Sequence, residues 1–192
     1  MYDLLRARLA ARPRREIAGL RRAAVLVPLL DEDGPRRLLL TRRAEGLPTH
    51  RGHVAFPGGG VEPRDRDATA TALREAEEEV GLRPAEVEVL GWLDDFPTLH
   101  GDVAVTPVIG RVRGAPRWAP AAGEVARVFE VPVAELAQVE RWRVETHELF
   151  GRRWPVYFFD HDGEVLWGLS AYIALATLEH LAEGAPFALP AI

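Results

Sequence analysis

Four acidic residues lie close together in the stretch TALREAEEEVGL: Glu75, Glu77, Glu78 and Glu79. On a helix, with about 100° per residue, Glu75, Glu78 and Glu79 share one edge, and Glu77 points away. Unpaired carboxylates this close repel one another, and the pKa of at least one rises. Because Mg²⁺ prefers carboxylate oxygens, a divalent cation would relieve that repulsion. Taken alone, the glutamates are equally consistent with a solvated acidic face in which Arg74 pairs with Glu78.

A glycine-rich turn, FPGGG, lies shortly before these glutamates at residues 56–60. Pro57 stiffens the entry to the turn, and glycines let the backbone come close to a metal or a phosphate. Most such turns are only tight turns, so the motif alone is weak evidence. Next to a helix with three carboxylates on one edge, it predicts a cradle for a metal-bound phosphate.

Hydrophobic patterning places this loop and helix within an α/β fold. The helix is predicted to start between Asp67 and Thr69 and to end at Gly81. Strands are predicted over residues 23–30, 36–43, 87–96, 103–113 and 126–133. A hairpin that turns at HDG is predicted within residues 147–168, and helices over residues 133–139 and 169–182. This order indicates a mixed sheet with helices packed on it.

Composition limits the classes of function. The 192 residues are 47% hydrophobic, enough for the core of one domain, and contain no Cys. Disulfides, zinc ribbons and thiol nucleophiles are therefore excluded. A formal net charge of -5 argues against a nucleic-acid partner, which needs a basic surface.

Neither end of the chain reads as a membrane segment. Residues 1–21 are Arg-rich and amphipathic, lack the apolar core of a signal peptide, and predict an N-terminal helical arm. The most apolar helix candidate, LSAYIALATLEHLAEG, is too short to span a bilayer. We therefore expect a cytoplasmic protein without a membrane partner. The sequence leaves open whether it is a monomer or a homodimer.

The segment of residues 56–82 resembles the Nudix box with its glycine-rich loop. Its run from Arg74 to Leu82, REAEEEVGL, matches every fixed place in the most specific part of that motif. The upstream stretch LLTRRAEGLPTHRGHVAFPGG, residues 39–59, is similar to the signature of the coenzyme A diphosphatase branch. The later stretches TPV, EVARVFEVPV and LWGLSA also fit this branch.

Three positions depart from the family pattern. Asp65 stands, with one extra residue after it, where the general box has a Glu, and its role is left open. Gly60 stands where the branch often has Lys, and Arg127 where it often has Glu. None of the three is among the expected metal ligands.

The resemblance implies a single Nudix-like α/β/α sandwich over residues 1–192, with a mixed central sheet. It also implies hydrolysis of a diphosphate in a nucleoside diphosphate derivative, with Mg²⁺ or Mn²⁺ as cofactor. Glu75, Glu78 and Glu79 would hold the metal, together with the backbone carbonyl near Gly59. Arg74 would orient these carboxylates.

The other roles in the site also need residues. The resemblance places a carboxylate at Glu124, opposite the box helix, which makes Glu124 the first candidate for the general base that takes a proton from water; Glu78 is the second. Arg43 and Arg51 flank the loop and could grip phosphates, beside the backbone of Gly58 and Gly59. His50 and His53 line the same loop, but with no Cys neighbours and a carboxylate cluster nearby we do not expect them to bind zinc.

Three functions remain open at this stage. The first is cleavage of coenzyme A, with its thioesters as further candidates, to 3′,5′-ADP and a 4′-phosphopantetheine product. The second is a Nudix hydrolase for ADP-ribose, a dinucleotide or an oxidised nucleotide. The third, from another class, is a non-catalytic nucleotide sensor, although such a protein need not retain all the metal-binding glutamates.

Overall fold

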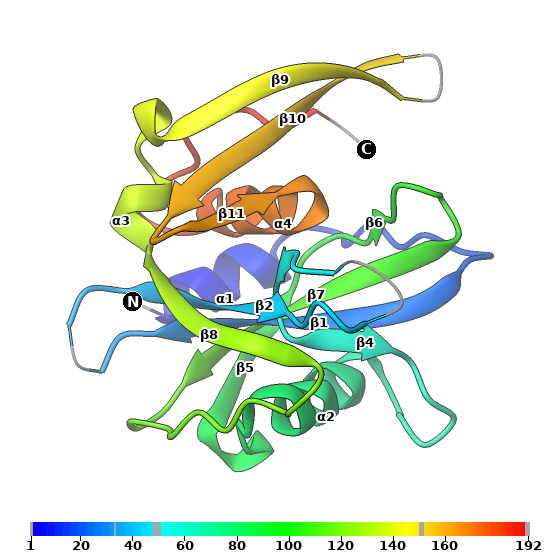
Figure 1. The fold of residues 1–192 in the computed structure, drawn as a ribbon, viewed down its shortest axis with the longest axis vertical. Helices are drawn as coiled ribbons and strands as arrows, with labels where there is room; N and C mark the ends of the chain where they lie inside the picture. The colour runs from blue at the N-terminus through cyan, green and yellow to red at the C-terminus, as the bar shows by residue number, and fades with distance from the viewer. Residues whose placement is uncertain (1, 33, 48–50, 150–151, 191–192) are drawn as a thin grey trace.

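A mixed β-sheet forms the centre of the molecule in this computed structural model, which describes residues 2–32, 34–47, 51–149 and 152–190 (Figure 1). β1 (Arg21–Leu30) runs parallel to β7 (Val103–Val112) and antiparallel to β2 (Arg37–Arg43). β2 pairs on its other side with β8 (Val125–Pro132). The sheet also contains β3 (Val54–Ala55), β4 (Gly58–Gly60), β5 (Val87–Trp92) and β6 (Phe96–Pro97).

Helices cover both faces of this sheet (Figure 1). α2 (Ala68–Val80) lies on one face, and α1 (Tyr2–Ala10) and α4 (Gly168–Leu178) lie on the other. Side chains that alternate along β1 divide between two cores: Leu26 packs in the cluster of α2, and Val27 in the cluster of α1 and α4. The predicted α/β/α sandwich with a mixed central sheet is confirmed.

A second, smaller sheet lies beyond α4 and was not predicted (Figure 1). It consists of β9 (Trp142–Leu149), β10 (Arg152–His161) and β11 (Glu164–Trp167), in the order β11-β10-β9. The predicted hairpin with HDG at its turn is confirmed, because Asp162 and Gly163 join β10 to β11 with φ values of 50° and 80°. Two consecutive positive φ values are typical of the tight turns that match strand twist.

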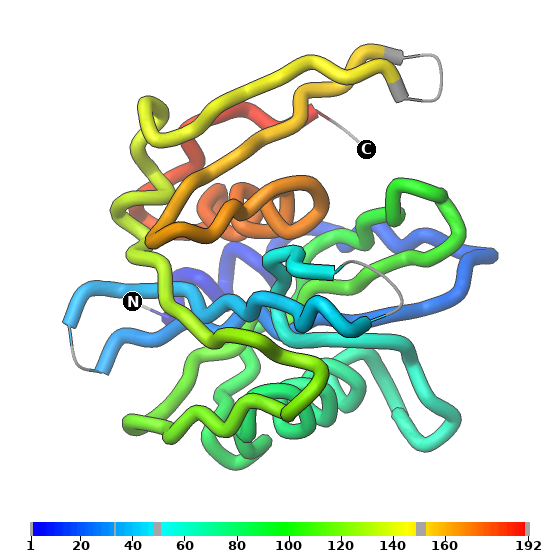
Figure 2. Tube along the Cα trace, viewed as in Figure 1, coloured from blue at the N-terminus to red at the C-terminus, as the bar shows by residue number. Residues whose placement is uncertain are grey.

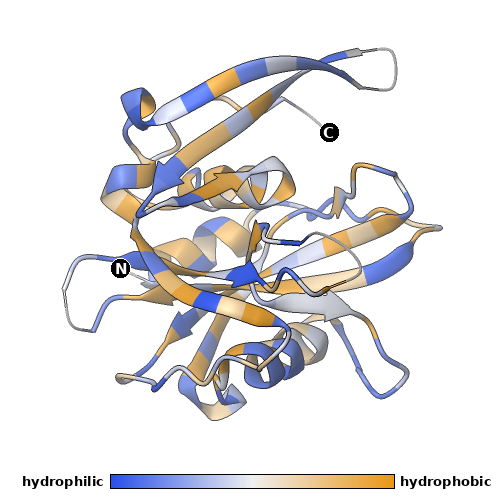
Figure 3. Ribbon diagram, in the orientation of Figure 1, coloured by the Kyte–Doolittle hydropathy of each residue, from blue (hydrophilic) through white to orange (hydrophobic). Residues whose placement is uncertain are grey.

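Local capping signals fix the ends of α2. The Asp67 side chain accepts a hydrogen bond from the Ala70 N–H, which satisfies a free donor of the first turn. Gly81 ends the helix in the left-handed region, with φ 74°, and its N–H donates to the Ala76 and Glu77 carbonyls. Both predicted ends are therefore confirmed. Most of α2's outer surface is hydrophilic, whereas β7 and β8 are mainly hydrophobic (Figure 3).

The N-terminal arm differs from the prediction. A helix was expected through residues 1–21, but α1 ends at Ala10, because Pro13 has no N–H to donate and would clash with the preceding turn. Leu5 and Leu9 are buried, and Leu9 lies against Gly91 of β5, so α1 docks on its own chain. α4 likewise ends at Leu178, earlier than the predicted Ala182.

The other helical segments are short. They are α3 (Val133–Leu136) and the 3-10 turns η1 (Pro84–Glu86) and η2 (Val139–Arg141). Across the described ranges, no helix has both the length and the apolar character needed to cross a membrane.

Candidate active site

The glycine strand β4 lies directly against two glutamates of α2. Gly59 pairs with Ala24 of β1, and the Gly58 N–H donates to Oε2 of Glu79 at 3.2 Å. A Cβ atom added at Gly59 would lie 2.5 Å from Oε1 of Glu75. The predicted glycine cradle and two of its three predicted carboxylates are thus brought together, and this closeness requires glycine.

Glu79 is a buried acid with few compensating partners. Its relative exposure is 5%, and burial raises its pKa to about 7. The Gly58 N–H and the Arg43 charge oppose this rise, whereas the negative charges of Glu75 and Glu124 add to it. Burial also raises the pKa of Glu75, against the opposing effect of Arg74. The site therefore holds more carboxylate charge than its own side chains neutralise.

Arg74, the residue expected to orient the carboxylates, donates hydrogen bonds to two of them. Its Nη1 donates to Glu75 at 2.8 Å and to Glu78 at 3.1 Å. Its Nη2 donates to the Gly60 carbonyl at 3.0 Å, so the same side chain also ties α2 to β4. Asp65 binds the remaining side of the guanidinium group through two hydrogen bonds. The sequence alone had left this role of Asp65 open.

Glu78 lies at the outer edge of the cluster. Its side chain is 50% exposed and pairs with Arg74 and with Arg64, at 3.1 and 3.3 Å. As the side chains stand, no three Asp, Glu or His residues in the described ranges form a ready metal-binding group. The donor chemistry of Glu75 and Glu79 nevertheless fits a hard divalent cation, because both are partly or fully buried carboxylates raised in pKa by burial and like charge. In this structure, Arg74 balances part of the negative charge of Glu75 and Glu78.

The ends of β2 and β8 bring Arg43 and Glu124 to the same cluster. Nη1 of Arg43 lies 3.7 Å from Oε1 of Glu79. Nε of Arg43 is buried and has no hydrogen-bond partner among the described residues. The Ala44 N–H donates to the Glu124 carbonyl at 2.8 Å, and Glu124 is close enough to raise the pKa of Glu79. Residues 113–124 reach this point by passing over the end of α2 (Figure 2).

Two loop residues behave differently from Arg43. Arg51 is exposed, and its Nε donates to the Leu47 carbonyl at 2.6 Å, so its guanidinium is bonded within its own loop. His53 makes an edge contact with the Trp167 ring, with centroids 5.0 Å apart. His50 lies outside the described residues. The position of Trp167 beside this loop was not predicted from the sequence.

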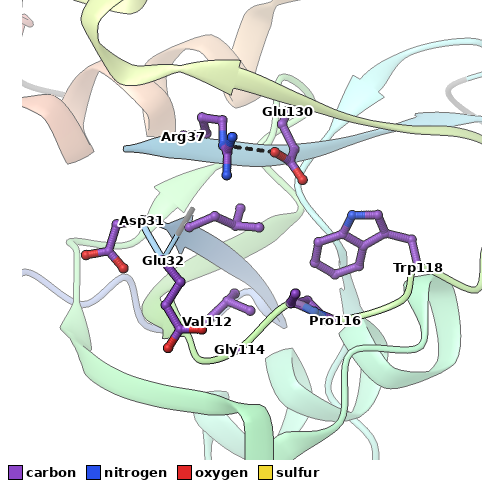
Figure 4. Close-up of a pocket in the computed structure, with 10 residues that line it drawn as sticks. Asp31, Glu32, Arg37, Val112, Gly114, Pro116, Trp118 and Glu130 are labelled. Carbon is purple, nitrogen blue, oxygen red and sulfur yellow. Dashed lines mark ion pairs between the residues drawn. The ribbon is translucent and has the colours of Figure 1, made fainter. Parts of the chain in front are cut away.

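A cavity of about 110 Å³ lies at the opposite ends of β1 and β2 (Figure 4). Asp31, Glu32 and Trp118 line it, together with the ion pair of Arg37 and Glu130, at 3.0 Å. None of the predicted site residues lines this cavity. The candidate active site is instead the open surface between β4, α2 and the ends of β2 and β8.

Comparison with known proteins identifies the family. Residues 20–166 match the family described as NUDIX domain, so the chain belongs to the Nudix family. An uncharacterized Nudix hydrolase NudL of Photorhabdus laumondii is 40% identical over 161 residues, which are 84% of this chain and 85% of that protein. Nudix hydrolase 15, mitochondrial, of Arabidopsis thaliana is 40% identical over 162 residues, 81% of this chain and 56% of that protein.

Solved structures share the fold at low sequence identity. A MutT/nudix family protein from Enterococcus faecalis has a TM-score of 0.54 and 18% identity, over 92% of this chain and 69% of that one. The Nudix hydrolase RenU from M. smegmatis has a TM-score of 0.51 and 23% identity, over 63% of this chain and 76% of that one. These likenesses support the Nudix fold assigned above.

Proposed function

We propose that this Nudix protein is a metal-dependent hydrolase of nucleoside diphosphate derivatives and that coenzyme A is its preferred substrate. The observation that carries the proposal is the pair of carboxylates, Glu75 and Glu79, held against the glycine backbone of β4 beside Arg43. Buried carboxylates next to a cation and a close-approach backbone suit a metal-bound diphosphate.

Glu75 and Glu79 would hold Mg²⁺ or Mn²⁺, with Glu78 and the backbone at Gly59 as further ligands. When bound, the metal neutralises diphosphate charge and lowers the pKa of a coordinated water. Arg74 keeps the Glu75 carboxylate fixed while Asp65 fixes Arg74. Arg43, with its buried and unbonded Nε, would donate to a phosphate oxygen of the substrate.

Glu124 is the first candidate for the general base. It is exposed, and it belongs to a loop that is hydrogen-bonded to the end of β2. Its negative charge contributes to the raised pKa of Glu79. An exposed carboxylate beside the metal ligands can accept a proton from water and release it to solvent. Glu78, already paired with two arginines, is the second candidate.

The choice of coenzyme A rests on the stretch upstream of the box. Residues 39–59 resemble the coenzyme A diphosphatase signature, and their described part includes β3 and most of β2, whose last residue, Arg43, lies at the site. Coenzyme A carries a 3′-phosphate besides its diphosphate, and Arg51 offers an exposed guanidinium in this segment. Cleavage would yield 3′,5′-ADP and 4′-phosphopantetheine.

Product analysis by mass spectrometry tests this proposal. The protein is offered coenzyme A, ADP-ribose, NADH and 8-oxo-dGTP separately, with Mg²⁺, with Mn²⁺ and with EDTA. We expect metal-dependent release of 3′,5′-ADP from coenzyme A ahead of every other cleavage. Glu75→Gln should abolish it, whereas Glu77→Gln, on the exposed side of α2, should not.

Each other result has a distinct meaning. Preference for ADP-ribose or 8-oxo-dGTP would retain the hydrolase and overturn the choice of coenzyme A. No cleavage of any substrate would favour a nucleotide sensor. Glu78→Gln and Glu79→Gln variants that keep function in cells would then support the sensor.

A further inference from the structure

The outer face of the small sheet carries a stack of flat side chains. Phe158 of β10 stands opposite Trp167 of β11 on one side and opposite Arg143 of β9 on the other. The Phe158 and Trp167 ring planes are 7° from parallel, with centroids 5.9 Å apart. The guanidinium carbon of Arg143 lies 4.1 Å from the Phe158 centroid. The three groups form one cross-strand stack, Arg143–Phe158–Trp167.

This stack ends at Trp167. β11 is an edge strand of the small sheet, so beyond Trp167 there is no further strand of that sheet in the described chain. Phe158 stacks against the Trp167 ring from within the small sheet. Trp167 keeps 38% relative exposure, a high value for the largest apolar side chain. The Trp167 side chain is therefore partly accessible to solvent at the end of the stack.

The stack ends beside the candidate active site. The His53 ring meets the Trp167 ring edge-on at 5.0 Å. The His53 carbonyl accepts a hydrogen bond from the Arg43 N–H at 3.0 Å, so these two residues are neighbours across the β2–β3 hairpin. Arg43 reaches Glu79 at 3.7 Å. A chain of contacts through His53 and Arg43 therefore links the Trp167 ring to Glu79 of the carboxylate cluster.

We propose that the exposed part of the Trp167 ring is a stacking platform for the purine base of the substrate. The proposal rests on the proposed function, because it assigns one end of a nucleoside diphosphate derivative to this surface. A diphosphate held at Glu75, Glu79 and Arg43 leaves its base to extend past His53 onto Trp167. Phe158 and Arg143 behind Trp167 hold the ring upright, since side chains in a cross-strand row support one another.

The chemistry of the platform favours a base over the other end of coenzyme A. A purine is flat and aromatic, and a base stacks on an indole face whatever its hydrogen-bonding pattern. Pantetheine is a flexible amide chain that gains little from a flat ring and loses more conformational freedom on binding. Trp167 itself makes no side-chain hydrogen bond at the start of α4, so its ring is not needed to cap that helix.

Calorimetric titration with AMP tests the platform without turnover. AMP has a purine base and one phosphate, so it reports on the base whichever diphosphate proves to be the substrate. Trp167→Ala and Trp167→Leu should weaken AMP binding about tenfold, while Trp167→Phe keeps most of it. Val165→Ala is the matched control, because Val165 lies on the same face of β11 with the same 38% exposure and outside the stack.

Two further measurements identify the occupant. For coenzyme A, Trp167→Leu should raise KM about tenfold and leave kcat near the wild-type value. The affinity of the Trp167→Leu variant for 4′-phosphopantetheine should equal that of the wild type. If the wild type cleaves no coenzyme A but loses AMP binding on Trp167→Leu, the proposed substrate is wrong and the platform stands.

Three results overturn the platform itself. They are wild-type AMP affinity in both Trp167→Ala and Trp167→Leu, the absence of AMP binding by the wild type, and a loss of 4′-phosphopantetheine affinity in place of AMP affinity. Circular dichroism of each variant shows whether the variant is folded. Should Trp167→Ala fail to fold, the comparison of Trp167→Leu with Trp167→Phe decides the question, because both keep apolar bulk and only Phe keeps a ring.

Discussion

Asp65 and Arg74 share two parallel hydrogen bonds, from Nη2 to Oδ2 at 2.9 Å and from Nε to Oδ1 at 3.2 Å. Two bonds fix the guanidinium plane as well as its position. The Nη1 that remains donates to Glu75 at 2.8 Å. The hydrogen bonds from Arg74, with one from the Glu62 N–H, hold the pKa of Asp65 well below its usual range, so the pair stays ionised at neutral pH. Asp65 therefore acts on the carboxylate cluster through Arg74.

Asp65→Asn should lower kcat/KM about tenfold to a hundredfold, because it removes one charge-assisted bond and frees the Arg74 plane to rotate. The Mg²⁺ concentration for half-maximal activity should rise in parallel, which a merely structural role would not produce. Arg66→Gln is the control, since the Arg66 side chain is 85% exposed beside Asp65. An unchanged Mg²⁺ requirement in Asp65→Asn would show that Asp65 does not position the site.

Mg²⁺ should raise the melting temperature of the wild type. A ligand that binds only the folded state adds about 2.7 kcal/mol of stability at a hundred times its Kd. The Glu75→Gln/Glu79→Gln double variant should lose this shift, whatever its melting temperature in EDTA. Glu77→Gln should keep it, because Glu77 lies on the exposed side of α2. An equal Mg²⁺ shift in the double variant would place the metal elsewhere.

The helix with the glutamates was predictable because its signals are local. Asp67 and Gly81 mark its ends through contacts within five residues, and a period of 3.6 alone sets which glutamates share an edge. The glycine turn before it was also readable. Pro13 is a local signal that a helix ends, and the predicted helical arm over residues 1–21 did not take it into account. The structure corrects that prediction, because α1 ends at Ala10.

The surroundings of the site could not be read in the same way. Nothing near Glu79 in the sequence shows that Gly58 and Arg43 would bury it, because those contacts depend on the register of β4 and β2. Trp167 lies more than a hundred positions from His53 in the sequence, yet their rings touch. Loop paths and sheet-to-sheet packing decide such contacts, and neither has a periodic signal.

Acid should destabilise the protein partly through Asp95. This carboxylate has 1% relative exposure, and burial raises its pKa, but hydrogen bonds from Thr106, Arg14 and the Ile17 N–H outweigh burial and lower it below 3.8. The Asp95 carboxylate therefore binds a proton more readily in the unfolded chain than in the folded protein. The contribution of Asp95 is thus complete above about pH 4 and is lost as the pH falls through the lowered pKa of the folded state.

Asp95→Asn should cost about 1–3 kcal/mol at neutral pH, because Arg14 loses a charged partner. It should also flatten the fall in stability below pH 4. Urea denaturation at several pH values measures both effects. Asp160→Asn, at an exposed position of β10, should change neither. If the free energy of unfolding fell as steeply below pH 4 in Asp95→Asn as in the wild type, other carboxylates would be responsible for the acid sensitivity.

The three glycines of β4 should respond differently to alanine. At Gly58 a Cβ would lie 2.4 Å from the Ala24 carbonyl oxygen and 2.6 Å from the Val25 Cα, which are backbone atoms that cannot yield. Gly58→Ala should therefore lower the free energy of unfolding, by about 1–3 kcal/mol. At Gly60 the Cβ would meet nothing within 4 Å, so Gly60→Ala should be close to neutral.

Gly59→Ala should impair metal binding and activity without destabilising the fold. Its Cβ would lie 2.5 Å from Oε1 of Glu75, the movable end of a side chain, so the strand can stay while the carboxylate is displaced. We expect a melting temperature in EDTA near that of Gly60→Ala, but loss of the Mg²⁺ shift and of most activity. Thermal melts with and without Mg²⁺, run beside the hydrolysis assay on all three variants, measure this. If Gly59→Ala kept both metal response and activity, the close approach of Gly59 to Glu75 would not matter for catalysis.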